Sequence, residues 1–246
     1  MHDSRVALVT GAGRRVGSVI ARTLHARGCR IALHYRGSHG DAEALAAEFE
    51  SARPGSVLAL QADLLDAQAL PALVARAVEH FGQLDFLVNN ASSFFATPIG
   101  TIGETQWSDL TGSNLKAPLF LSQAAAPHLK ATHGAIVNIV DIHAERPLAG
   151  YPVYSAAKAG LLGLTRALAI ELGPEVRVNG IAPGAIAWPE DGQFTAAERE
   201  EIISHTLLRR MGSPQDVAGA VAFLLLDAPY VTGQILAVDG GRSAHL

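Results

Sequence analysis

The sequence has little of what marks a secreted, membrane-spanning or nucleic-acid-binding protein. It holds one cysteine, Cys29, among 246 residues, which excludes a disulfide within the chain and agrees with a reducing compartment. The net charge of −4 offers no basic footprint for nucleic acid or for an anionic membrane. No secretory h-region precedes the first expected strand, and no apolar run is long enough to span a bilayer. We therefore expect a cytoplasmic protein without nucleic-acid or membrane partners.

Metal-binding patterns are also missing. The ten histidines are scattered, with no His-Glu-x-x-His or similar ligand spacing, so we expect no metal site. Hydrophobic residues make up 49% of the chain and charged residues 17%, which suits a folded globular protein. The length suffices for a sizeable core, and no linker or repeat interrupts the sequence. We expect one domain over residues 1–246.

Short apolar runs alternate with stretches of helical periodicity along the chain. The expected strands are Arg5–Thr10, Cys29–Tyr35, Val57–Gln61, Phe86–Val88, Ala135–Val140, Arg177–Ile181 and Gln234–Val238. The expected helices are Val16–Arg27, Ala42–Ser51, Ala67–Phe81, about Trp107 to Lys130, Tyr154–Leu172 and Pro214 to Leu226. Strands that are continuously apolar and separated by helices predict an α/β fold, a doubly wound parallel sheet with helices on both faces. Between the last two strands we expect an irregular, lid-like substrate loop at about 183–212, with Pro183–Phe194 as its mobile part.

A glycine-rich turn joins the first strand to the first helix. The segment Thr10-Gly11-Ala12-Gly13-Arg14-Arg15-Val16-Gly17 stands where a pyrophosphate can meet a helix N-terminus, as in Rossmann-type sheets. Its two arginines add positive charge beside the expected phosphates. An ordinary strand-to-helix turn is the alternative, but the strand before it and the helix after it favour dinucleotide binding. We expect Gly11, Arg14, Arg15, Val16 and Gly17 to bind the cofactor.

The end of the second strand indicates which dinucleotide binds. The segment His34-Tyr35-Arg36-Gly37-Ser38 contains no acidic residue to accept a hydrogen bond from a ribose 2′-hydroxyl. Arg36 and the nearby hydroxyls suit a 2′-phosphate instead. A surface arginine is the alternative interpretation of Arg36. We expect NADPH rather than NADH, with His34, Tyr35, Arg36 and Ser38 at its adenosine end.

Tyr154 and Lys158 are four residues apart, so on a helix they share one face. The ammonium can stabilise a phenolate and make the tyrosine a usable proton donor near neutral pH. Asp141 stands thirteen residues before Tyr154, where carbonyl chemistry would place a hydroxyl that positions a C=O oxygen. A carboxylate suits the N–H groups of a nitrogen heterocycle better than it suits a carbonyl. Asp141 could also be no more than a strand-end cap.

These motifs together resemble the short-chain dehydrogenase/reductase family over nearly the whole chain. The resemblance also rests on Asn89-Asn90-Ala91, Asn114, Pro183-Gly184 and Asp239-Gly240-Gly241. Four details are most similar to the pteridine reductases of that family: Arg15 in place of the middle glycine, the run Asn90-Ala91-Ser92-Ser93-Phe94-Phe95, the end of the second strand, and Asp141.

The resemblance implies a role for each matching residue. On the catalytic side, Asn114 would interrupt its long helix and support a water-linked proton path, and Lys158 would bind the nicotinamide ribose and lower the pKa of Tyr154. The other cofactor contacts implied are Asp63 and Leu64 beside the adenine, Asn90, Ala91 and Ser92 along the cofactor, and Pro183 with Gly184 near its nicotinamide end. The substrate contacts implied are Arg15 bridging phosphate and pterin, Ser92, Phe94 stacking on the pterin, Asp141 and Tyr154 at its nitrogen edge, and Trp188. The resemblance also implies a homotetramer with two-fold axes.

Two departures from the family pattern affect these expectations. The threonine that often follows Pro183-Gly184 is missing at its usual spacing, and Trp188-Pro189 follows instead, which reshapes the substrate end. Arg36-Gly37 stands where the pteridine reductases have a basic pair. For Phe94, an ordinary place in the core is the alternative to substrate stacking.

Three functions are compatible with these residues. The first is an NADPH-dependent pteridine reductase acting on dihydropterins, with oxidised pterins or dihydrofolate as further substrates. The second is a short-chain carbonyl reductase or alcohol dehydrogenase, for example of the 3-oxoacyl type, in which Asp141 has an unusual role. The third is an inactive nucleotide-sensing protein or scaffold, against which Tyr154, Lys158 and Asn114 argue because all three are intact.

Overall fold

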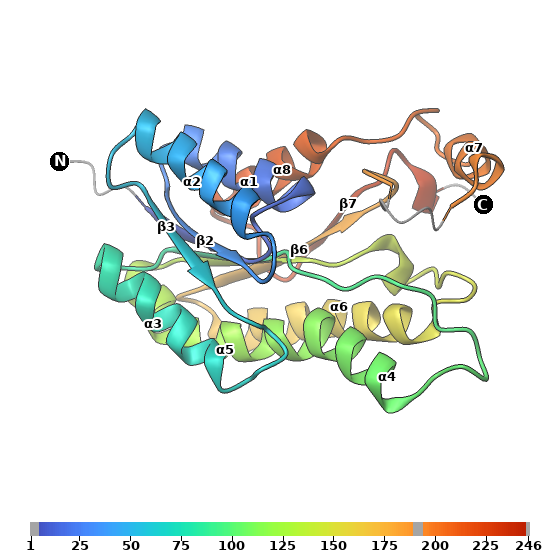
Figure 1. Ribbon diagram of the computed structural model, residues 1–246, viewed down its shortest axis with the longest axis horizontal. Coiled ribbons are helices and arrows are strands. Elements are labelled where there is room, and N and C mark those ends of the chain that lie inside the picture. Colours follow the sequence, from blue (N-terminus) through green and yellow to red (C-terminus); the bar gives the residue numbers. More distant parts are fainter. Residues whose placement is uncertain (1–4, 189–193, 245–246) are drawn as a thin grey trace.

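A computed structural model describes residues 5–188 and 194–244, which form a seven-stranded parallel sheet with helices on both faces (Figure 1). The strand order is β3-β2-β1-β4-β5-β6-β7. The strands are β1 (Val6–Val9), β2 (Arg30–Tyr35), β3 (Val57–Gln61), β4 (Phe86–Asn89), β5 (Ala135–Ile139), β6 (Arg177–Pro183) and β7 (Ile235–Val238). This confirms the doubly wound α/β fold expected from the alternation of strands and helices.

The helices lie in two layers, one on each side of the sheet (Figure 1). The layer over one face contains α1 (Arg15–Ala26), α2 (His39–Ala52) and α8 (Pro214–Ala222), with α1 packed on α8. The layer over the other face contains α3 (Ala69–Phe81), α4 (Glu104–Thr111), α5 (Ala117–Thr132) and α6 (Pro152–Leu172), with α3 packed on α5. Because both faces are covered, the four residues of β1 are fully buried, which explains why the strands are apolar without alternation.

The helix expected from about Trp107 to Lys130 is interrupted. A π-helical turn, Gly112–Lys116, separates α4 from α5, and a second one, Phe223–Asp227, follows α8. Such π-helical turns insert a residue into the helical ladder and often mark functional sites.

Helix α2 begins at His39, three residues before the expected start.

The segment expected to be irregular contains a helix. Helix α7 (Ala196–Ser204) begins with a capping box in which Thr195 and Glu198 exchange hydrogen bonds, at 2.7 and 3.3 Å. The expectation of a mobile part over Pro183–Phe194 includes residues 189–193, which lie outside the described residues. No helix in the described ranges is both long and apolar enough to cross a membrane.

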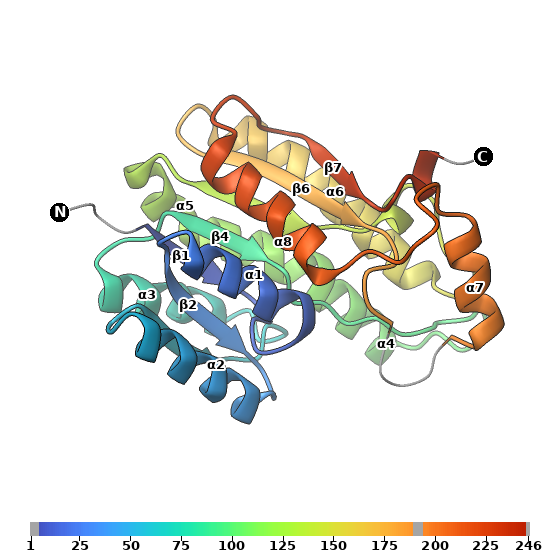
Figure 2. The same cartoon turned by 90° about the horizontal axis from the view of Figure 1, so that it is seen from above.

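Strands β1 and β4 lie side by side at the point where the chain reverses its direction of travel across the sheet. The loops after these two strands diverge to opposite faces, so a crevice opens at their carboxyl ends, where doubly wound sheets bind ligands. Helix α7 and the described C-terminal residues lie together at this same end of the molecule (Figure 2).

Candidate active site

A cleft of about 760 Å³ lies at the carboxyl ends of the strands. Its lining includes most of the residues expected from the sequence: Gly11, Arg14, Arg15, Val16, Gly17, His34, Arg36, Ser38, Asp63, Leu64, Asn90, Ala91, Ser92, Phe94, Asp141, Tyr154, Lys158, Pro183, Gly184 and Trp188. Tyr35 and Asn114 do not line the cleft. The ring of Tyr35 is buried in the core, and its hydroxyl pairs with Nδ1 of His39 at 2.8 Å. A contact between Tyr35 and a cofactor stays a prediction.

Two side chains fix the glycine-rich turn. Nδ1 of His34 accepts a hydrogen bond from the Gly11 N–H at 3.2 Å, and its Nε2 pairs with the Ala62 carbonyl at 3.2 Å. Burial lowers the pKa of His34 to about 4, so the ring is neutral and can act as acceptor at one nitrogen and donor at the other. From the end of β4, the Asn90 side chain donates to the carbonyls of Thr10 and Gly11 at 2.8 and 3.2 Å.

The turn is shaped to bring backbone N–H groups to an anion. A Cβ atom at Gly17 would lie 2.1 Å from the Gly11 carbonyl oxygen, so only glycine lets helix and turn approach this closely. No side chain caps the N-terminus of α1, and its first turn holds no acidic residue. Uncapped N–H groups and the helix dipole attract negative charge, so this cradle fits a pyrophosphate.

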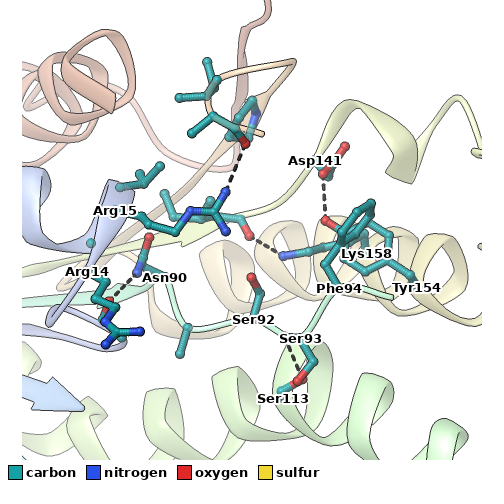
Figure 3. Close-up of a pocket in the computed structure, with 18 of the residues that line it drawn as sticks. Arg14, Arg15, Asn90, Ser92, Ser93, Phe94, Ser113, Asp141, Tyr154 and Lys158 are labelled. Atoms are coloured by element: carbon teal, nitrogen blue, oxygen red, sulfur yellow. Dashed lines mark hydrogen bonds between the residues drawn. The ribbon is translucent and has the colours of Figure 1, made fainter. Parts of the chain in front are cut away.

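Arg15 adopts a backbone conformation that favours glycine, with φ 51°. Its guanidinium extends from the turn across the cleft and donates to the carbonyls of Ala187 at 3.0 Å and Trp188 at 3.3 Å (Figure 3). A strained residue persists where the surroundings hold it and function favours it. Arg15 thus links the phosphate-binding turn to the segment that follows β6.

Asp141 follows β5 and uses its two carboxylate oxygens for different purposes. Oδ1 accepts the His143 N–H at 2.8 Å and so caps a short 3₁₀ turn, Ile142–Ala144. Oδ2 accepts a hydrogen bond from the Tyr154 hydroxyl at 2.7 Å (Figure 3). The strand-end cap is therefore present, and it leaves the second oxygen for the tyrosine. A contact between Asp141 and a substrate stays a prediction.

Tyr154 and Lys158 lie on one face of α6, as their spacing predicts, but their electrostatics differ from the expectation. Burial and the Asp141 carboxylate raise the pKa of Tyr154 well above its ordinary value. The resemblance implied that Lys158 lowers the pKa of Tyr154, whereas burial and Asp141 raise it. Burial also lowers the pKa of Lys158 to about 8, while Asp141 opposes that shift. The Lys158 Nζ donates to the Ile139 carbonyl at 2.8 Å and lies 5.7 Å from the centre of the Tyr154 ring.

Asn114 lies in the π-helical turn Gly112–Lys116, so the interruption of the helix expected at this residue is present. Its side-chain nitrogen donates to the carbonyls of Ser93 and Leu110, both at 2.9 Å. Its Oδ1 is buried and has no hydrogen-bond partner among the described residues. A buried oxygen of this kind ordinarily takes a water molecule.

Aromatic rings fix the orientation of Phe94. Tyr151 stacks on it with ring centres 4.7 Å apart, and Tyr154 meets it edge-on at 4.8 Å. Phe194 lies nearly parallel to Phe94 at 6.5 Å and packs at an angle against Trp188 at 5.7 Å. This cluster makes one side of the cleft suitable for a flat ring.

No role was expected from the sequence for several of the lining residues, among them Gly37, Leu65, Ser93, Ser113, His143, Leu148 and Arg242. Phe194 and Ile202 also line the cleft and belong to the substrate loop expected at about 183–212. Among these residues, Arg242 stands out because its guanidinium is a charged hydrogen-bond donor. It directly follows Asp239-Gly240-Gly241, which is the sequence signal that could have drawn attention to it.

Comparisons with known proteins agree with this geometry. A family model described as enoyl-(acyl carrier protein) reductase matches residues 11–243. Pteridine reductase 1 of Leishmania tarentolae is 39% identical, with 97% of this chain and 96% of that protein covered. The chain belongs to the short-chain dehydrogenase/reductase family. The 3-oxoacyl-[acyl-carrier-protein] reductase of Staphylococcus aureus (strain N315) is 36% identical, with 98% and 99% covered. A putative ketoacyl reductase of the granaticin polyketide synthase of Streptomyces violaceoruber is 38% identical, with 99% and 97% covered.

Membership of the short-chain dehydrogenase/reductase family makes the protein an oxidoreductase that uses a nicotinamide dinucleotide of the NAD(P)(H) class. The names of these relatives point to different substrates at nearly equal identity, so the choice of substrate depends on the residues of the cleft.

Proposed function

We propose that the protein is an NADPH-dependent pteridine reductase that reduces dihydropterins, with oxidised pterins and dihydrofolate as further substrates. The observation that carries this proposal is the hydrogen bond of 2.7 Å between the Tyr154 hydroxyl and the Asp141 carboxylate. A similar pteridine reductase, at 39% identity, adds support.

The carboxylate of Asp141 selects against a carbonyl and for a nitrogen ring. A carboxylate oxygen is only an acceptor, so it repels a C=O oxygen placed beside the tyrosine. Ring N–H and amino groups donate, and hydrogen bonds from such donors to a charged acceptor are short and strong. Pterins present both kinds of donor on one edge.

NADPH is favoured over NADH by the end of β2. Arg36, Gly37 and Ser38 line the cleft there, and no acidic residue stands among them to accept a ribose hydroxyl. A Cβ at Gly13 would lie 2.3 Å from Ser38 Oγ, so the turn and this segment pack tightly together. Arg36 is exposed and can pair with a 2′-phosphate. At the adenine end, Asp63 and Leu64 line the same cleft.

The residues of α6 deliver the proton. When bound, NADPH supplies a hydride to a carbon of the ring, and one proton on nitrogen completes the reduction. A tyrosine is protonated at neutral pH, and burial and Asp141 raise the pKa of Tyr154 further, so its hydroxyl can act as the proton donor. The ammonium of Lys158 stabilises the phenolate that remains. Asn114, through its unpartnered Oδ1, holds a water by which the proton is replaced.

The remaining substrate contacts follow from what lines the cleft. Phe94 offers an oriented ring for the pterin to stack on, and Ser92 adds a hydroxyl beside it. Arg15 bridges the cofactor phosphate and the pterin, and Trp188 closes the far side.

A 3-oxoacyl-type carbonyl reductase is the second candidate, favoured by relatives at 36% and 38% identity and by the intact Tyr154–Lys158 pair. Thermal shift in the presence of NADPH separates the two. A pterin or methotrexate should stabilise the protein, and β-ketoacyl compounds or simple ketones should not. The reverse pattern would favour the carbonyl reductase.

Assembly as a homotetramer is part of the proposal, as is a single domain spanning the chain. Large apolar side chains are exposed on the outer helices: Ile170 of α6 is 84% exposed and Leu119 of α5 38%. Exposed apolar residues on long helices are typical of the surfaces that pack against each other across a two-fold axis.

A further inference from the structure

The C-terminal turn is built to hold Arg242 in the cleft. The Asp239 carboxylate accepts the N–H groups of Gly241 at 2.9 Å and Ser243 at 2.6 Å. Gly240 and Gly241 have φ values of 63° and 82°, which favour glycine. A Cβ at Gly241 would lie 2.7 Å from the Leu207 side chain, so the turn packs closely against the segment after α7. The position of Arg242 is therefore fixed by its own backbone.

The other arginine and lysine side chains that line the described part of the cleft bind protein groups or lie at its adenosine end. Arg15 donates to the Ala187 and Trp188 carbonyls, and Lys158 donates to the Ile139 carbonyl. Arg14 pairs with Asp41, and Arg36 stands at the adenosine end. The half-buried guanidinium of Arg242 donates no hydrogen bond to any described residue.

Arg242 remains a cation at the substrate end. Burial lowers its pKa, and the charges of Asp141, Asp239 and Glu201 raise it. Arginine stays protonated at every working pH. None of the ion pairs formed among the described residues includes Arg242, and the Asp239 carboxylate already accepts two backbone N–H groups. A guanidinium that makes no hydrogen bond with the described residues is costly to keep half-buried unless a ligand uses it.

Apolar residues line the cleft together with Arg242. Leu148 follows β5, Phe194 precedes α7, and Ile202 belongs to α7. Such side chains suit an uncharged, flat spacer rather than a short hydroxylated chain. The combination of an apolar lining with a guanidinium matches a substrate whose tail continues through an apolar group to a carboxylate.

We propose that Arg242 is a specificity-determining residue that binds a carboxylate on the tail of the substrate, so that the enzyme prefers pterins with a long, anionic tail to tailless ones. The guanidinium fork and a carboxylate form two parallel hydrogen bonds. The preference rests on the proposed pterin reduction. This proposal goes beyond pterin reduction because it assigns the chemical class of the substrate tail and the residue that binds it.

Steady-state kinetics on two substrates tests this assignment. Dihydrofolate carries an aromatic spacer and carboxylates, whereas 6-methyl-dihydropterin carries neither. Arg242→Gln should lower kcat/KM for dihydrofolate by about tenfold or more, mainly through KM, because a charge-assisted contact of ordinary strength is lost. For 6-methyl-dihydropterin kcat/KM should change by less than about threefold, since the lost contact lies outside the ring. Arg242→Lys should recover part of the loss, and Arg76→Gln, a change at an exposed residue of α3 outside the cleft, is the matched control.

A binding measurement provides a second readout that does not depend on turnover. Calorimetry with NADPH present compares methotrexate, which carries the carboxylates, with 2,4-diamino-6-methylpteridine, which does not. Arg242→Gln should weaken methotrexate alone. An equal loss for both members of either pair would overturn the proposal and make Arg242 a residue that positions Asp141, and no loss would overturn it as well. If the unaltered protein reduces no pterin, the proposed function itself fails, an outcome distinct from a variant that keeps both activities.

Discussion

Tyr154 donates its hydroxyl hydrogen to Oδ2 of Asp141 across 2.7 Å, while Oδ1 of the same carboxylate holds the backbone of His143. The carboxylate is thus anchored on one side and directed at the proton donor on the other. An anchored group costs little reorganisation when a substrate arrives, which is the basis of electrostatic preorganisation.

The first prediction concerns the pKa of Tyr154. Asp141→Asn removes the negative charge that opposes ionisation of the phenol, so the pKa of Tyr154 should fall. Titration of tyrosinate by ultraviolet absorbance measures this, with Tyr154→Phe in each background subtracted to isolate the one residue. An unchanged pKa would mean that burial alone sets the ionisation of Tyr154.

The second prediction concerns cofactor choice. Arg36→Asp removes a charge-assisted contact and adds repulsion towards a 2′-phosphate, so the preference for NADPH over NADH should fall at least about tenfold, given about 1.5–3 kcal/mol for such contacts. Ratios of kcat/KM for the two cofactors measure it, and Arg76→Asp, outside the cleft, should leave the ratio unchanged. Equal use of NADH and NADPH by the unaltered protein would contradict the assignment.

The third prediction concerns stability in acid. Burial lowers the pKa of His34 from its ordinary value of 6.5, which the unfolded chain retains, to about 4 in the folded protein. Between these two values the unfolded chain binds more protons than the folded one. The free energy of unfolding should therefore fall as the pH drops below 6.5. At pH 4 the loss caused by protonation of His34 should be about 3 kcal/mol relative to neutral pH.

His34→Asn keeps an acceptor and a donor but does not titrate, so its free energy of unfolding should vary less with pH over the same range. Urea unfolding at about pH 7.5 and at about pH 4.5 measures the difference between the two proteins. If the free energy of unfolding changes equally between the two pH values in both proteins, His34 is not the titrating group.

The fourth prediction concerns assembly. Ile170→Glu places a charge on the exposed apolar face of α6, so the mass measured by light scattering should drop below that of a tetramer. Ile99→Glu is the matched control because Ile99 is also 85% exposed but lies in the loop before α4. A protein that is only monomeric at micromolar concentration before any substitution would contradict the tetramer.

The sheet was predictable because its signal is local. Apolar runs such as Val6–Val9 are buried on both faces, and hydrophobic pattern alone identifies them. Helix α7 was missed because it has no buried residue and so leaves no apolar stripe in the sequence. The capping box of Thr195 and Glu198 was the one signal that could have revealed it.

The candidate site was predictable where a motif carries it and not where distant segments meet. Tyr154, Lys158 and Asp141 come from spacings within the chain, whereas Arg242 reaches the cleft through packing between the C-terminal turn and the residues after α7. The contact between Arg15 and the carbonyls 172 and 173 residues away is likewise invisible in sequence. The ring of Tyr35 shows the converse, because a residue inside a cofactor motif packs into the core.

Asp141→Ser tests the central claim most directly. The substitution removes the acceptor for ring N–H groups and restores the hydroxyl of carbonyl reductases, while NADPH binding, which depends on the glycine-rich turn and Lys158, should be nearly unchanged. Steady-state kinetics on a dihydropterin and on a simple ketone, for both proteins, should show a strong loss of pterin reduction by the variant and no loss with the ketone. Pterin reduction by the variant as fast as by the parent would make Asp141 a structural cap and contradict the assignment of the protein as a pteridine reductase.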